Sequence, residues 1–390
     1  MAISLTKFFF AIPLIILTMC STIFRSGSSA GFDYPAVFNF GDSNSDTGEL
    51  LAGKGFSLRL PYGETYFQSP SSGRFCNGRL IIDFLMEATG LPYLRAYLDS
   101  VGRPSFRKGC NYAAGGSTIL PGTAASISPF SFGVQINQFI HFKSRVLQLR
   151  AQGDKKIGKF LPVEKYFKDG VYMFDIGQND LTAAFYSKAS MDQAIPTILT
   201  EFEIGLQKLY EQGARNFWIH NTGPLGCLAQ NIATFGSDPS KLDEFGCLTS
   251  HNQAAKLFNS QLHDLSKKLQ SQYVDATVTY VDIYTIKFNL IANYSQLGFE
   301  QPIMTCCGFG GPPLNYDSRL SCGLTKTLNG TVVTANGCDD SSKYVNWDGV
   351  HYTEAANEYV SSQILTGKYC DPPFSSVHQK MPFFFKYFKF

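Results

Sequence analysis

Three side chains that could together hydrolyse an ester stand far apart in this sequence of 390 residues. Ser43 lies in FGDSNSDTG (40–48), and Asp348 and His351 lie in NWDGVH (346–351). A serine hydroxyl is a weak nucleophile until a base takes its proton. A histidine can be that base, and a nearby carboxylate can orient its imidazole ring. These residue types predict nucleophilic catalysis by Ser43, with His351 as the base and Asp348 as its orienting carboxylate.

The residues around Ser43 predict a turn that presents its hydroxyl. The apolar run 37–40 indicates the end of a buried strand. Gly41 is expected to turn the chain, because glycine tolerates a positive φ. Asp42 and Asp46 are expected to accept hydrogen bonds from neighbouring backbone N–H groups and so hold the turn.

Hydrolysis through a tetrahedral intermediate also needs donors aimed at the developing oxyanion. The backbone N–H of Ser43 is one candidate. A second is the backbone N–H of Gly116 in NYAAGGS, and a third is the side-chain amide of Asn179 in GQND. Gly115 adjoins Gly116, so the second donor could lie one residue earlier.

The elements that must position these groups alternate between strands and helices. Continuous apolar runs indicate strands buried on both faces, and apolar residues at three- and four-residue spacings indicate helices. This alternation predicts an α/β fold with a parallel sheet covered on both faces. Strands are expected in 37–40, 170–177, 215–223 and 277–285, with a weaker one in 107–117. Helices are expected in 192–212, 250–272 and 353–365.

Ligands of such sheets bind outside the carboxyl ends of the strands. Ser43, Asn179 and Asn221 each follow a predicted strand, so their side chains are expected to meet at one edge of the sheet. His220 precedes Asn221 and is the competing candidate for the base. It has no carboxylate near it in the sequence.

Together the four blocks that contain Ser43, Gly116, Asn179 and His351 resemble the plant GDSL esterase/lipase family, a branch of the SGNH hydrolases. All four stand in the family's order, and the resemblance, which includes TGPLGC (222–227), covers nearly all of the chain. It implies a three-layer α/β/α, flavodoxin-like fold with a central parallel sheet and no large lid. It also implies a Ser-Asp-His triad that needs no metal and no organic cofactor.

Closer detail resembles one subgroup of the family, the early-nodulin-like proteins, fucosidase-like proteins and acetylesterases of plant glycosides. The segments that carry this likeness are GCDDSSKYVNWDGVHYTEAAN (337–357) and DPPF (371–374). The subgroup implies removal of acetyl or other short acyl groups from a carbohydrate or glycoside. Cys76 departs from the pattern, because many relatives have serine there.

Four alternatives stay open at this point. The chain could be a lipase acting on longer acyl esters, or an acyltransferase that passes the acyl group to an alcohol. It could be a non-catalytic carbohydrate-binding protein with the same fold. A glycosidase would need two carboxylates beside the scissile bond, and Asp42, Asp46 and Asp180 are the candidates.

The N-terminus predicts export. Residues 1–30 combine a lysine, a short apolar run and small residues before the expected cleavage site, as signal peptides do. An uncleaved membrane anchor is the alternative. Residues 31–390 are expected to form a single hydrolase domain. The expected location is secreted, extracellular or in the cell wall, with the Golgi or the vacuole as alternatives.

The composition of the chain limits the kinds of partner that the protein is expected to bind. The formal net charge is +2, and removal of residues 1–30 brings it to zero, so no basic surface for nucleic acid is expected. We expect an ester substrate, a monomer, and no stable membrane insertion, although the aromatic and basic tail 380–390 could touch a membrane. Nine cysteines remain after cleavage, so at least one is expected to lack an intramolecular disulfide. Asn293 and Asn329 occupy glycosylation sequons.

Overall fold

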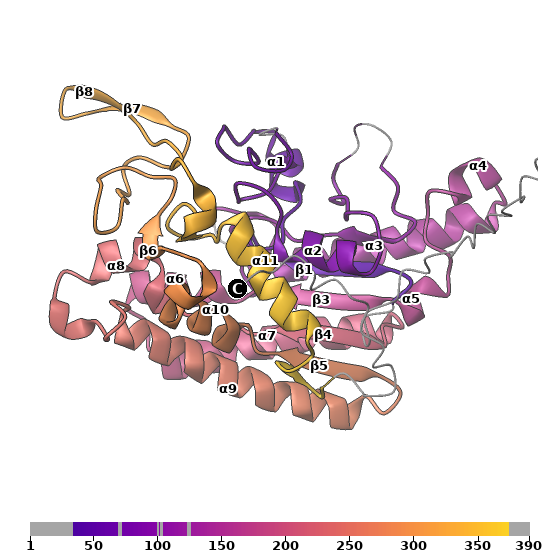
Figure 1. Cartoon of the computed structure of the whole chain (residues 1–390). Helices are drawn as coiled ribbons and strands as arrows, with labels where there is room; N and C mark the ends of the chain where they lie inside the picture. The colour runs from indigo at the N-terminus through magenta and orange to yellow at the C-terminus, as the bar shows by residue number, and fades with distance from the viewer. Residues whose placement is uncertain (1–33, 69–71, 100, 102–103, 123–125, 374–390) are drawn as a thin grey trace, which may run out of the picture.

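The computed structural model describes residues 34–68, 72–99, 101, 104–122 and 126–373. The predicted signal peptide and the tail 380–390 lie outside these residues. At the centre is a six-stranded sheet in the order β10-β5-β4-β3-β1-β2 (Figure 1). Its strands are β1 (Val37–Gly41), β2 (Gly109–Asn111), β3 (Val171–Asp175), β4 (Asn216–His220), β5 (Thr277–Val281) and β10 (Cys370–Asp371). All neighbouring strands are parallel except β10, which pairs antiparallel with β5.

Helices cover both faces of the sheet because alternate strand residues are apolar on both sides. Phe38 and Phe40 of β1 belong to one apolar cluster, and Val37 of the same strand belongs to the other. The first cluster is closed by α3 (Phe132–Ala151), α7 (Met191–Glu211) and α9 (Thr249–Gln272). The second is closed by α2 (Ile81–Ala88), α10 (Ile283–Ala292) and α11 (Glu354–Leu365). The three-layer α/β/α prediction is confirmed, and the parallel strand order 2-1-3-4-5 is the flavodoxin-like one.

Shorter helices and strands lie outside the central sheet and the six helices that cover it. The remaining helices are α1 (Glu49–Lys54), α4 (Lys155–Gly158), α5 (Tyr166–Asp169), α6 (Gln178–Ser187) and α8 (Ala229–Phe235). Strand β6 (Gln301–Thr305) pairs with β9 (Tyr344–Asn346), and β7 (Thr325–Leu328) pairs with β8 (Thr331–Thr334). The β7–β8 hairpin projects from the body of the molecule (Figure 1).

The predicted elements all occur, but the predicted strands are longer than those observed: β4 ends at His220 rather than at 223, and β2 spans only Gly109–Asn111 of 107–117. The expected helices 192–212, 250–272 and 353–365 match α7, α9 and α11 to within a residue at each end. The expected strand 277–285 is too long, because β5 ends at Val281 and α10 begins at Ile283. Asp282 causes this break, since its side chain accepts a hydrogen bond of 3.0 Å from the Thr285 backbone N–H and caps the helix.

Three disulfides hold the loops. They join Cys227 to Cys247, Cys306 to Cys338 and Cys307 to Cys322. Among the described residues Cys76, Cys110 and Cys370 are free and buried, in agreement with the odd count in the sequence. The Cys306 N–H donates to the Asn346 carbonyl, and the Cys307 N–H donates to the Trp347 carbonyl. The two disulfides after β6 therefore brace the loop that carries the NWDGVH motif.

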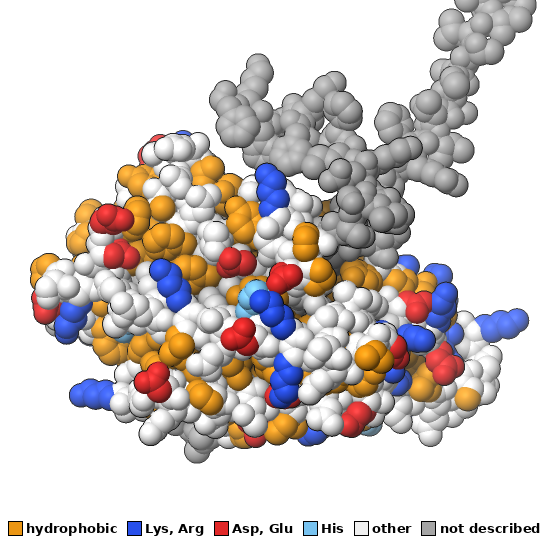
Figure 2. All heavy atoms as spheres, turned by 90° about the horizontal axis from the view of Figure 1, so that it is seen from below, with side chains coloured by type: hydrophobic (Ala, Val, Ile, Leu, Met, Phe, Trp, Pro, Cys, Tyr) orange, Lys and Arg blue, Asp and Glu red, His pale blue; other side chains and the backbone are white. Residues whose placement is uncertain are grey.

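The surface has no strong charge segregation on the face in Figure 2, where acidic and basic side chains are interspersed. A nucleic-acid-binding face gathers Lys and Arg into a patch or stripe, and this face does not. Within the described ranges, none of the helices combines the length and the apolar character needed to cross a bilayer.

Candidate active site

Ser43 sits just beyond β1, in a turn that acidic side chains hold from within. Asp42 Oδ1 accepts a hydrogen bond of 3.0 Å from the Asn44 backbone N–H. Asp46 Oδ1 accepts bonds of 2.7 Å from the backbone N–H groups of Gly48 and of the first residue of α1. The prediction that the two aspartates hold the turn is confirmed.

The prediction that Gly41 turns the chain with a positive φ is wrong. It is the last residue of β1 and is not among the residues with a positive φ. A Cβ at this position would lie 2.6 Å from the Asp175 carbonyl oxygen and 2.7 Å from Ser45 Oγ. Glycine is needed here because the turn packs directly against the neighbouring strand, and any side chain would push them apart.

A continuous hydrogen-bonded chain joins Ser43, His351 and Asp348. Ser43 Oγ lies 2.7 Å from His351 Nε2, and His351 Nδ1 lies 2.7 Å from Asp348 Oδ2. The serine and the histidine are separated by most of the chain, and both stand at the carboxyl edge of the sheet. These are the distances at which a base can take a hydroxyl proton.

Both oxygens of the Asp348 carboxylate accept hydrogen bonds. Its Oδ1 accepts from the backbone N–H groups of Val350 (3.0 Å) and His351 (2.9 Å), and its Oδ2 accepts from His351 Nδ1 and the Tyr62 hydroxyl (2.7 Å). Burial alone would raise the pKa of Asp348, but the charge and hydrogen bonds of His351 and the Tyr62 hydroxyl lower it to about 2. The carboxylate is therefore ionised at neutral pH and can hold the imidazole in one tautomer.

His220, the competing base, is not brought to Ser43. It is buried at the end of β4, where its Nδ1 lies 3.9 Å from Asp175 Oδ2. Neither of its ring nitrogens has a hydrogen-bond partner among the described residues. Among the histidines that the structure describes, only His351 occupies the position that a base for Ser43 requires.

The segment that contains Gly115 and Gly116 is tied to the Ser43 turn. The Ala114 N–H donates to the Gly41 carbonyl (3.2 Å), and the Gly115 N–H donates to Asp46 Oδ2 (2.7 Å). The Gly116 N–H makes no hydrogen bond with any described residue. Of the two glycines, Gly116 therefore has the N–H without a partner among the described residues, and its role as an oxyanion donor stays a prediction.

Asn179 links the third block to the other two. It lies in the first turn of α6, and its Nδ2 donates to the Ser117 carbonyl (2.9 Å) and to Asp42 Oδ2 (3.1 Å). Both N–H bonds of the amide are engaged, so donation to an oxyanion requires one of these contacts to be exchanged. The next residue, Asp180, accepts from the backbone N–H groups of Ile119 and Leu120 and fixes the segment after Gly116.

A hollow opens beside Ser43, and both polar and apolar side chains line it. Three chain segments from the carboxyl edge of the sheet contribute to it, together with α10 and the loop before α11. The lining residues are Ser43, Asn44, Asp175, Gln178, Asn179, Thr182, Asn221, Thr222, Gly223, Pro224, Leu225, Leu228, Lys287, Val350 and Tyr352. The polar residues predicted to gather at this edge do so.

Comparison with known proteins agrees with this arrangement. Residues 37–364 match the model of the GDSL-like lipase/acylhydrolase family. The chain belongs to this family. It is therefore a carboxylic ester hydrolase of the GDSL group.

Several plant GDSL esterase/lipases resemble the chain over most of its length. One from Arabidopsis thaliana is 59% identical over 399 residues, covering 95% of this chain and 96% of the relative. A second from the same plant is 62% identical over 342 residues, covering 87% and 90%. GDSL esterase/lipase ENOD8 of Medicago truncatula is 43% identical over 388 residues, covering 96% of each chain.

Two residues next to the site of this GDSL hydrolase were missed by sequence reasoning. Tyr62 comes from the loop between α1 and α2 and bonds Asp348. Phe75 packs against His351 with tilted rings whose centroids are 5.4 Å apart, and its ring would be 2.6 Å from a Cβ on Gly115. Neither residue has a spacing to the motif residues that could reveal it, since both reach the site through loop geometry.

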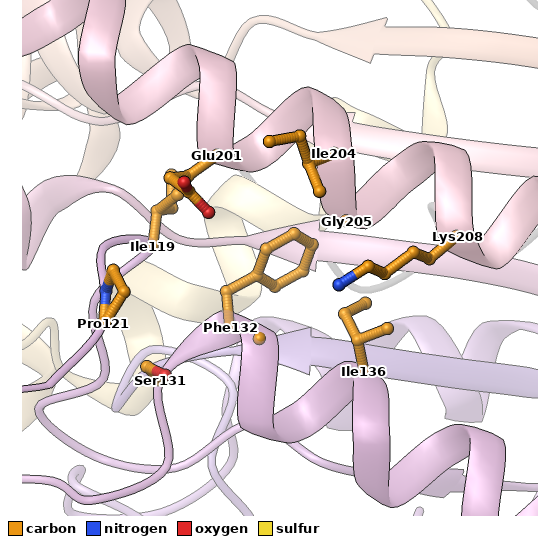
Figure 3. A pocket seen from close by; sticks show the side chains of 10 residues that line it. Ile119, Pro121, Ser131, Phe132, Ile136, Glu201, Ile204, Gly205 and Lys208 are labelled. Atoms are coloured by element: carbon orange, nitrogen blue, oxygen red, sulfur yellow. The ribbon is translucent and has the colours of Figure 1, made fainter.

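A second hollow lies between α3 and α7 (Figure 3). Phe132 and Ile136 of α3 face Glu201, Ile204 and Lys208 of α7 across it (Figure 3). None of the predicted site residues lines it. We therefore expect the hydrolase chemistry in the hollow beside Ser43.

Replacing Tyr62 by phenylalanine should lower kcat for ester hydrolysis by about threefold to tenfold, less than the full effect of a lost hydrogen bond to a charged group, because Asp348 keeps its other donors. Loss of this donor lets the pKa of Asp348 rise and leaves the carboxylate less firmly oriented. KM should change little, since Tyr62 acts through Asp348 and not on the substrate. Steady-state kinetics test this, with Tyr66→Phe as the control, which removes the hydroxyl of an exposed tyrosine that bonds Tyr93 and not Asp348. An unchanged kcat in Tyr62→Phe contradicts the prediction.

Proposed function

We propose that the protein is an exported serine esterase that removes acetyl or other short acyl groups from a carbohydrate or glycoside. The observation that carries the proposal is the hydrogen-bonded chain from Ser43 Oγ through His351 to Asp348. Membership of the GDSL-like lipase/acylhydrolase family supports ester hydrolysis in general.

The proposed mechanism has two halves. His351 Nε2 takes the Ser43 proton while Oγ attacks the ester carbonyl, and Asp348 stabilises the imidazolium. The N–H groups of Ser43 and Gly116 and the Asn179 amide donate to the oxyanion. His351 then protonates the leaving alcohol, and water hydrolyses the acyl-enzyme by the reverse sequence. The proposed steps use no metal and no organic cofactor.

The character of the hollow beside Ser43 supports a polar substrate with a short acyl group. Asp175, Gln178 and Lys287 line it together with three asparagines. A long acyl chain packed against these groups would take them out of water and offer no hydrogen bond in return, which is costly. A sugar hydroxyl can both donate and accept. This favours the glycoside esterase over the lipase alternative.

The glycosidase alternative has less support. Its candidate carboxylates are Asp42, Asp46 and Asp180, and each of them accepts at least two N–H hydrogen bonds from the surrounding turns. None of the three lines the hollow beside Ser43, so they are poorly placed to flank a glycosidic bond there. The acyltransferase alternative shares the acyl-enzyme, and its test is the addition of an acceptor alcohol.

Activity on p-nitrophenyl esters should fall steeply from acetate to butyrate to palmitate. We expect this order because a longer acyl chain would pack against the charged and amide side chains that line part of the hollow, which is costly. The measurement is kcat/KM for each ester, with the protein produced in a secreting host. Palmitate hydrolysed as fast as acetate would replace the proposal with a lipase. An absence of hydrolysis with all three esters would contradict it.

Export and glycosylation are parts of the same proposal. Three disulfides are consistent with an oxidising compartment. Asn329 is exposed at the turn between β7 and β8, and we propose it as the better glycan acceptor. Asn293 is half-buried, and its Nδ2 donates to Asn289 Oδ1 at 2.6 Å. Intact mass measured before and after glycosidase treatment of Asn329→Gln tests this assignment.

A further inference from the structure

The hollow beside Ser43 contains a cation that the proposed mechanism does not use. Lys287 of α10 is 4% exposed, yet it lines the hollow. Its Nζ lies 4.1 Å from the centroid of the Tyr352 ring and 3.9 Å from where a Cβ of Gly223 would stand. Both of those residues line the hollow too. The ammonium group is thus held at the wall of the site.

No described residue accepts a hydrogen bond from the Lys287 ammonium, and none forms an ion pair with it. Buried ammonium groups are almost always paired, because each unpaired N–H loses its bond to water. The cation–π contact with Tyr352 satisfies one face of the group only. Lys287 therefore keeps donors available towards the hollow.

Asp175 supplies a matching acceptor. It is the last residue of β3 and lines the same hollow. Its Oδ1 accepts from Gln178 Nε2 at 3.0 Å, whereas its Oδ2 accepts no hydrogen bond from a described residue and lies 3.9 Å from His220 Nδ1. A carboxylate oxygen that can accept and an ammonium that can donate are thus held in one wall of the site.

The charges in this wall favour a neutral ligand. Burial lowers the pKa of Lys287, and the nearby carboxylates of Asp175 and Asp42 oppose this shift. Burial would raise the pKa of Asp175, but His220, Lys287 and Gln178 lower it overall. The cation already faces the acidic side chains of Asp175 and Asp42, so a phosphate or a uronate would gain little. A hydroxyl group is both donor and acceptor and suits such a pair.

We propose that Lys287 and Asp175 bind hydroxyl groups of the sugar that carries the scissile ester, with Lys287 donating and Asp175 accepting. The inference rests on the proposed function, since it names the part of the hollow that recognises the glycoside. The pair then acts as a specificity determinant: a simple aryl ester lacks the hydroxyls and leaves both groups unpaired.

The test compares two substrates. One is a methyl glucoside with a single acetyl group on its primary hydroxyl, and the other is p-nitrophenyl acetate. In Lys287→Met, the ratio of kcat/KM for the sugar ester to kcat/KM for the aryl ester should fall by about tenfold to a hundredfold, the usual effect of a lost hydrogen bond to a charged group. Lys256→Met is the matched control: this exposed lysine also lies over aromatic rings of α10 but does not line the hollow.

Monodeoxy analogues of the sugar ester make the test independent of folding of the variant. In the wild type, at least one analogue should lose about tenfold or more in kcat/KM. If Lys287 bonds the missing hydroxyl, the same analogue should lose almost nothing further in Lys287→Met, because the residue and the hydroxyl form one interaction. Two results would overturn the inference. One is an equal loss of kcat/KM on the sugar ester and on the aryl ester in Lys287→Met. The other is a wild type whose kcat/KM is the same for every deoxy analogue.

The failure of the proposed function gives a different result. A wild type that hydrolyses long acyl esters and leaves the acetylated glucoside intact would overturn the proposed substrate class and this inference together. A wild type that hydrolyses the glucoside, with an unchanged substrate ratio in Lys287→Met, would overturn only the role of Lys287.

Discussion

Replacing Ser43 by alanine should lower kcat for p-nitrophenyl acetate by roughly 10⁴- to 10⁶-fold, the range for loss of an activated serine nucleophile. The hydroxyl oxygen that bonds His351 Nε2 at 2.7 Å is the atom proposed to attack the ester. Within the described part of the chain, no other hydroxyl bonds that nitrogen. The fold should persist, because the change removes one oxygen beside a hollow that water can enter. Circular dichroism and the thermal midpoint check the fold.

Ser45→Ala is the matched control for this variant. Ser45 lies in the same turn and is buried, and its Oγ has no hydrogen-bond partner among the described residues. Removing a buried, unsatisfied hydroxyl should leave activity and stability close to the wild type. Ser43→Ala protein that is folded and still retains more than about one hundredth of the activity would rule out Ser43 as the nucleophile, because such a loss is far smaller than a missing nucleophile causes.

The fold could be predicted from the sequence because its central strands are short, apolar and buried on both faces. The segments of β3 and β4 are continuous apolar runs, and the turn residues at their carboxyl ends mark the edge where the site lies. β10 could not be found in this way. It contains two residues and pairs antiparallel with β5, so it has no periodicity to detect.

The sequence could predict site residues only where two residues of suitable chemistry stand close together in the chain. His351 was identified because Asp348 stands three residues before it, and the structure joins them. Lys287 lies in an apolar helix and reads as an ordinary surface or core residue, since nothing in its neighbours indicates the hollow. Tyr62 reaches Asp348 across 286 positions of the chain. Such contacts depend on tertiary packing and leave no local pattern.

Replacing Asp348 by asparagine should lower kcat by about 10²- to 10⁴-fold, with the wrong imidazole tautomer as the cause. The backbone N–H groups of Val350 and His351 both point at Oδ1. They require an acceptor, so the asparagine oxygen must take that position and its NH₂ group must take the place of Oδ2. There the NH₂ group donates a hydrogen bond to His351 Nδ1. Nδ1 must therefore be unprotonated so that it can accept this bond. The proton then sits on Nε2, where it faces Ser43 and prevents proton abstraction.

The pH dependence separates this explanation from a loss of charge alone. Because the pKa of Asp348 is lowered to about 2, the wild-type carboxylate is ionised at every pH above about 4, and the deficit of Asp348→Asn should persist over that whole range. Asp340→Asn is the matched control: Asp340 accepts from the Ser342 N–H in the same segment of the chain and is exposed. ¹⁵N chemical shifts of the His351 ring report the tautomer directly. If Asp348→Asn has a reduced kcat but keeps the wild-type tautomer of His351, this explanation is wrong. The two backbone donors would then not have fixed the orientation of the asparagine amide.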